Sequence, residues 1–199
     1  MRKVLRVFLE ILILISLLSA ALALRLPWQS GLTASDDFFY AHLAADGARQ
    51  TLHFEKYLSE AQGGHIWPYP FRFPVWIPTA LTFYFCGISQ QHATLWPLLA
   101  SLLSILVVFL TARILFGTTA AFIAGCVLAA LPSDILHSSL LLPEAPANLF
   151  LALSAGAFLV AWKKHAPEIQ TAGSSLYFIS GLSLALGIWT REYLIFLFP

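Results

Sequence analysis

The chain has 199 residues, of which 11% are charged and 59% are hydrophobic, and its formal net charge is +1. Soluble domains carry about 25% charged residues, so this chain has too few to cover a soluble surface and too much apolar material to be disordered. A nucleic-acid-binding protein would carry a basic excess, which the small net charge argues against. The composition therefore indicates a membrane protein.

Long stretches without Asp, Glu, Lys or Arg are candidates for crossing the membrane, because a helical span needs about 20 mostly apolar residues. They cover residues 11–24, 73–112, 114–133, 145–162 and 169–190. We expect one transmembrane domain over 1–199 with five spans, at about 4–24, 93–112, 118–138, 146–162 and 172–190. At the start of the first span, Arg6 and Glu10 are four residues apart and can pair.

The segment 73–87 is the ambiguous part of the longest uncharged stretch. It is short and carries two prolines, so we expect it to lie along the outer surface, against the helices of the first loop, without crossing. This count places the N-terminus, Arg113 and the pair Lys163-Lys164 in the cytoplasm, as the positive-inside rule requires. It places the loop 25–76 outside.

The N-terminal stretch is also compatible with a cleaved signal peptide, since a basic start and an apolar core precede Ala21-Leu22-Ala23. The apolar core is long for a signal peptide, so we favour a span. Either outcome leaves the loop 25–76 outside.

The outer loop contains five of the ten acidic residues of the chain. Its middle, 36–60, has helical spacing of apolar residues, which predicts one or two amphipathic helices on the membrane surface. Two interpretations of Asp36 and Asp37 stay open. Ser35 is a good N-cap, and acids in a first turn favour the helix dipole. Alternatively, one carboxylate accepts a proton from an attacking hydroxyl and the other orients the acceptor.

A second outer segment, 133–147, contains Asp134, His137 and Glu144. Asp134 and His137 are three residues apart and can pair on a helical turn, while Glu144 lies near a helix start, where an acid is favourable. Arg191 follows the fifth predicted span. It marks the membrane interface or contacts a lipid phosphate, which a guanidinium binds in bidentate fashion.

Several motifs follow one another in a familiar order. They are Ser35-Asp36-Asp37-Phe38-Phe39-Tyr40, the proline and aromatic segment 67–76, the turn 110–117, Pro143-Glu144, and the segment 181–193. Together they resemble the N-terminal part of a membrane glycosyltransferase of the GT-C class, in the branch with protein O-mannosyltransferases and lipid A aminoarabinose transferases. Family members are longer and this chain stops in an apolar run, so we expect a part of a longer protein.

The resemblance implies an all-α polytopic membrane protein of the bacterial plasma membrane, with its active face outside. It implies inverting transfer of a sugar from a polyprenyl-phosphate donor to a glycan, lipid or protein acceptor. Asp36 or Asp37 would be the general base, with Asp36 preferred. The implied substrate contacts are Glu144, Arg191, Arg72 and Tyr40.

No cofactor is assigned from the sequence. Whether a divalent metal ion assists is open, with Asp36, Glu144 and His137 as possible ligands. The alternative function is a non-catalytic membrane protein, such as a transporter or an assembly subunit that handles lipid-linked sugars.

Overall fold

In the computed structural model, the described residues are 2–29, 31–33, 35–53, 55, 57, 59, 69–164 and 170–192, and they form helices without a strand. The long helices are α1 (Arg2–Arg25), α6 (Leu95–Phe116), α9 (Glu144–Lys164) and α10 (Gln170–Thr190). Helix α7 (Thr118–Ala129) has half their length and packs against α1 and α6 in the same bundle. The remaining helices are η1 (Leu26–Trp28), α2 (Ser35–Ala48), η2 (Tyr69–Phe71), α4 (Phe73–Cys86), α5 (Gln90–Ala93) and α8 (Pro132–Ser138). The predicted all-α class is confirmed.

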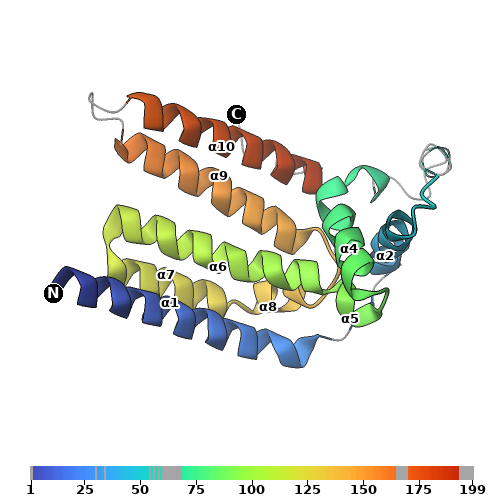
Figure 1. The fold of residues 1–199 in the computed structure, drawn as a ribbon, viewed down its shortest axis with the longest axis horizontal. Coiled ribbons are helices and arrows are strands. Elements are labelled where there is room, and N and C mark those ends of the chain that lie inside the picture. Colours follow the sequence, from blue (N-terminus) through green and yellow to red (C-terminus); the bar gives the residue numbers. More distant parts are fainter. Residues whose placement is uncertain are drawn as a thin grey trace.

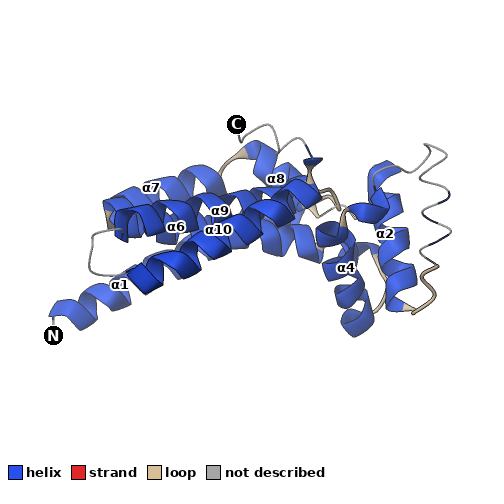
Figure 2. Ribbon diagram, turned by 90° about the horizontal axis from the view of Figure 1, so that it is seen from above, coloured by secondary structure: helices blue, strands red, loops and turns tan. Residues whose placement is uncertain are grey.

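The long helices lie side by side as a bundle, and the short helices gather at one end of it (Figure 1). The N-terminus lies at the opposite end, and a view turned by 90° shows α2 and α4 beyond the same end of the bundle (Figure 2). The ends of α1 and α10 and the beginnings of α6 and α9 therefore meet the short helices. The segments that carry the predicted site residues are gathered there.

Among the described residues, three stretches are long and apolar enough to cross a membrane: Val7–Trp28, Gln90–Phe116 and Glu144–Lys163. A fourth candidate is the pair of helices α7 and α8 taken together. The protein is thus an integral membrane protein, as predicted. The apolar helical stretch Ser174–Thr190 of α10 is shorter than these three, so the fifth span stays a prediction.

The segment 118–138, expected as one span, is not one continuous helix in the structure. Helix α7 ends at Ala129, and α8 begins at Pro132 after a bend of 61°. A proline ring disfavours helical geometry at the residue before it, and Leu131 has the extended ψ of 115°. This segment is therefore a broken span or a re-entrant loop.

Helix α4 packs against α2, as the sequence predicts for the segment 73–87. The two helices share a core of buried side chains that includes Tyr40 and Leu43 of α2 and Trp76 and Ala80 of α4. Helix α2 thus rests on protein, whereas we expected its apolar face to rest on the membrane. In the part of the expected helical region that follows α2, residues 54, 56, 58 and 60 lie outside the described residues.

Small residues allow the long helices to approach closely. A Cβ atom at Gly125 would lie 2.4 Å from a methyl group of Leu17, and one at Gly156 would lie 2.5 Å from the hydroxyl of Thr111. These glycines bring α7 against α1 and α9 against α6, in the way small residues serve in membrane helix packing.

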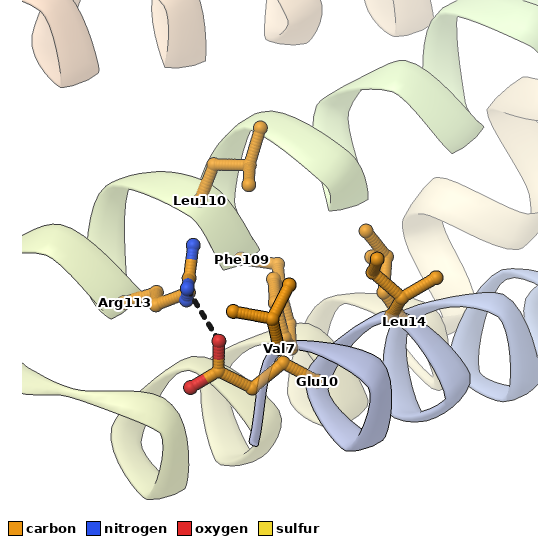
Figure 3. Close-up of a pocket in the computed structure, with 7 residues that line it drawn as sticks. Val7, Glu10, Leu14, Phe109, Leu110 and Arg113 are labelled. Atoms are coloured by element: carbon orange, nitrogen blue, oxygen red, sulfur yellow. Dashed lines mark hydrogen bonds and ion pairs between the residues drawn. The ribbon is translucent and has the colours of Figure 1, made fainter. Parts of the chain in front are cut away.

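Polar contacts close the end of the bundle near the N-terminus. Glu10 forms an ion pair with Arg113 and accepts a 2.8 Å hydrogen bond from Thr118. Figure 3 shows Glu10 and Arg113 pointing toward one another beside apolar side chains. Together these residues line a pocket of about 100 Å³. The Lys163 ammonium donates to the last carbonyls of α6, at 2.7 and 2.9 Å. The side chain of Arg6, the expected partner of Glu10, lies outside the described residues.

Candidate active site

The two neighbouring carboxylates at the start of α2 have different surroundings. Asp37 is fully buried, and its Oδ2 accepts a 3.1 Å hydrogen bond from the backbone N–H of Thr33. Asp36 is partly exposed. Adjacent residues of a helix point about 100° apart, so the two side chains leave α2 in different directions. Helix α2 begins at Ser35, and Asp37 in its first turn reaches back to the backbone just ahead of the helix.

Arg72, just before α4, joins two elements that are distant in sequence. Its NH1 group donates to the Tyr40 hydroxyl at 2.8 Å, and NH2 donates to both carboxylate oxygens of Glu192, at 2.7 and 3.0 Å. The Arg72 side chain is 5% exposed. The resemblance implied Tyr40 and Arg72 as separate substrate contacts. In the structure they form a hydrogen bond with each other.

The surroundings of Arg72 and Glu192 favour the ionised form of each side chain. Burial acts to raise the pKa of the Glu192 carboxyl, but a backbone hydrogen bond, Arg72 and nearby Arg191 outweigh it and hold that pKa below its ordinary value. Burial acts to lower the pKa of Arg72, and its contacts with Tyr40 and Glu192 outweigh this, so the pKa is raised. Both groups are therefore charged at neutral pH.

Glu144 and Arg191 form an ion pair across the beginning of α9 and the end of α10. The side chains are 18% and 26% exposed, so the pair is largely removed from solvent. The second carboxylate oxygen of Glu144 is buried and has no hydrogen-bond partner among the described residues. The structure thus brings together two residues that the sequence predicted separately as substrate contacts.

A buried hydrogen-bond network that was not predicted from the sequence joins the end of α1 to α6, α7 and α8. Arg25 is fully buried and donates to Asp134 at 2.6 Å, to Ser101 at 2.8 Å and to the Ala129 carbonyl at 3.0 Å. Ser101 also donates to Asp134, at 2.5 Å. We expected His137 as the partner of Asp134, whereas these hydrogen bonds tie Asp134 to Arg25 and Ser101. The sequence did contain a hint of this pair. Arg25 follows the first predicted span and Asp134 lies in an outer segment, so both were expected near the outer face of the membrane.

The site therefore combines carboxylates and arginines at one end of a membrane bundle. Such a set can accept a proton from a hydroxyl and can stabilise negative charge on a departing group. Within the described part of the chain, no group of three His, Cys, Asp or Glu residues is arranged to hold a metal ion.

Comparison with known families decides the class of protein. Residues 73–199, well over half of the chain, match the model of the dolichyl-phosphate-mannose-protein mannosyltransferase family. The chain belongs to this family. Comparisons with curated proteins and with solved structures found no match.

Membership of this mannosyltransferase family confirms the predicted resemblance and makes the protein a membrane glycosyltransferase in general terms. The match begins at Phe73, so it includes Glu144 and Arg191 and excludes α2 with its two carboxylates. Asp36, Asp37, Tyr40 and Arg72 lie outside the matched residues, so the roles that the resemblance implies for them stay predictions.

Proposed function

We propose that the protein transfers a sugar from a polyprenyl-phosphate donor to an acceptor hydroxyl on the non-cytoplasmic face of the membrane. The observation that supports this most directly is family membership combined with the gathering of acids and arginines at one end of an apolar bundle. A lipid-linked donor keeps its tail in the bilayer and presents its phosphate and sugar at such an end.

In the proposed reaction, Asp36 takes the proton of the acceptor hydroxyl while the oxygen attacks the anomeric carbon. The bond between that carbon and the phosphate oxygen breaks, and polyprenyl phosphate leaves with the electron pair. A phosphate is a weakly basic leaving group, so one carboxylate base suffices and no general acid is needed. A single displacement inverts the anomeric configuration.

The surroundings of the residues support a division of roles. Asp36 is preferred as the base because it is partly exposed, whereas the buried Asp37 holds the start of α2 through Thr33. Arg191 is the proposed contact of the donor phosphate, since a guanidinium suits a phosphate. Glu144 pairs with Arg191 and would orient it.

The test is to incubate membranes that contain the protein with polyprenyl-phosphate mannose and to measure free polyprenyl phosphate together with sugar in the acceptor fraction. The proposal predicts that both appear in equal amounts. Nucleotide-linked mannose, with the lipid carrier absent, serves as the control donor and should give neither product. Movement of intact donor across the membrane without release of polyprenyl phosphate would favour a transporter.

A further inference from the structure

A chain of contacts runs from α2 to the end of α10. We propose that Tyr40, Arg72 and Glu192 form a clasp of positioning residues that sets the separation between Asp36 and Arg191. This assignment replaces the role of substrate contact that the sequence pattern implies for Tyr40 and Arg72.

The geometry of Arg72 argues against direct contact with the donor. Both terminal nitrogens of its guanidinium donate to protein groups, NH1 to Tyr40 and NH2 to Glu192. With 5% of its side chain exposed, Arg72 could bind a phosphate in bidentate fashion only by giving up one of these contacts. The Tyr40 hydroxyl, on a fully buried side chain, is likewise turned to Arg72.

Each end of the clasp lies next to a residue of the proposed chemistry. Tyr40 is four residues after Asp36, one turn along the same face of α2. Glu192 directly follows Arg191, which pairs with Glu144. A displacement of α2 relative to the end of α10 would therefore move the proposed base relative to the proposed phosphate contact.

A second contact lies beside the clasp and joins α4 to α10. Phe73, which follows Arg72, meets Trp189 of α10 edge to face, with ring centroids 5.5 Å apart. This aromatic contact does not depend on charge, so α4 and α10 should stay together when Arg72 is changed. The clasp would then adjust their relative placement, and a misplacement of about 1 Å can cost roughly 100-fold in rate.

This inference rests on the proposed function, and a charge swap tests it. Arg72→Glu and Glu192→Arg should each lower kcat by about 100-fold, with the KM for the donor changed less than about threefold. The double variant should recover at least a tenth of the wild-type kcat, because the pair is restored and the Tyr40 hydroxyl can donate to a glutamate. Arg49→Glu, the same charge reversal at an exposed position after α2, is the control and should leave kcat unchanged.

If Arg72 instead binds the donor phosphate, the charge swap cannot restore donor binding, because position 72 then carries a carboxylate. The double variant would then stay as inactive as Arg72→Glu, with a raised KM, and the inference would be wrong.

A distance measurement separates this inference from the proposed function. Nitroxide labels on cysteines at the exposed positions His42 of α2 and Ala185 of α10, with Cys86 and Cys126 changed to Ser, report the separation of the helices. The distance distribution should be narrow in the wild-type background, broad or shifted in Arg72→Glu, and narrow again in the double variant. An unchanged distribution in Arg72→Glu would overturn the clasp. The wild-type protein could also fail to transfer sugar from any lipid-linked donor while the expected distance changes are observed. That result would overturn only the proposed function.

Discussion

At the scale of single residues, the environments of Asp36 and Asp37 lead to different expectations. Asp36→Asn should lower the transfer rate by about 10²–10⁴-fold, or roughly 3–5 kcal/mol of barrier, because an amide cannot accept the proton. Donor affinity should not change. Asp37→Asn should be milder, since the amide oxygen can still accept from the N–H of Thr33. Rates and donor affinities of both variants are the measurement.

The interpretation of Asp36 as a helix-terminal acid makes a different prediction. Asn serves at helix starts about as well as Asp, so the substitution would then be nearly silent. An Asp36→Asn enzyme that retains more than about a tenth of its rate would exclude Asp36 as the base.

The clasp should also have a defined pH dependence. The pKa of Glu192 lies below its ordinary value of 4.5 in the folded protein, so its ion pair with Arg72 stabilises the fold fully above that value. The contribution is lost as the pH falls through the lowered pKa. We expect the difference in thermal stability between wild type and Glu192→Gln to stay constant from pH 8 to about 5 and to shrink below about 4.5. A difference that already disappears between pH 7 and 6 would contradict this assignment.

The same residues mark how far the sequence could be taken. Glu144 and Arg191 were recognisable separately, because Glu144 directly precedes one uncharged stretch and Arg191 directly follows another. Their pairing was not recognisable, because 46 residues lie between them and no local spacing records a contact across two helices. Asp134 illustrates the same limit: the sequence offered the nearby His137, and the structure gives it Arg25, 109 positions away.

At the scale of elements, the buried pair of Arg25 and Asp134 joins the end of α1 to α8. Asp134→Leu should destabilise the protein by about 3–5 kcal/mol, because it leaves a buried guanidinium without its counter-charge. The double variant Arg25→Met with Asp134→Leu should recover most of this loss, since replacing both members of a buried pair by apolar residues is often neutral. Thermal unfolding in detergent micelles is the measurement.

Lys163→Met provides the control for this experiment. Lys163 is an exposed residue near the end of α9 whose ammonium donates to the last carbonyls of α6, and its removal should cost less than about 1 kcal/mol. If the double variant is as unstable as Asp134→Leu, the pair is not the source of the stability.

The break between α7 and α8 shows that an uncharged stretch predicts the presence of a membrane segment but not the shape of its backbone. The stretch 114–133 was recognised because it contains no charged residue. The bend arises from the backbone at Leu131 and Pro132, which that criterion does not consider. By contrast, the two prolines and short length of 73–87 correctly indicated a helix that packs against α2.

At the scale of the whole molecule, we predict that the N-terminus is cytoplasmic and the loop 25–76 faces outside. A cysteine at the exposed Ser59 should react with a membrane-impermeant reagent in intact cells, and one at Lys163 should react only after the membrane is opened. The Cys86→Ser, Cys126→Ser background provides the blank. Reaction of position 163 from outside, or protection of position 59, would contradict the orientation.

The general architecture was predictable because composition and motif order are properties of the sequence itself. Charge-free stretches gave the helical membrane class, and the order of motifs from Asp36-Asp37 to Arg191 indicated the family. The clasp through Arg72 was not predictable, since it depends on how α2, α4 and α10 meet at one end of the bundle.

The central claim is that the sugar moves in one displacement from polyprenyl phosphate to an acceptor hydroxyl activated by a carboxylate. The most direct measurement is the anomeric configuration of the transferred sugar, determined by NMR on product made from a donor of known configuration. The account predicts the opposite configuration in donor and product, because a single displacement inverts the anomeric carbon. A product with the configuration of the donor would contradict it and would instead indicate a covalent intermediate with two displacements.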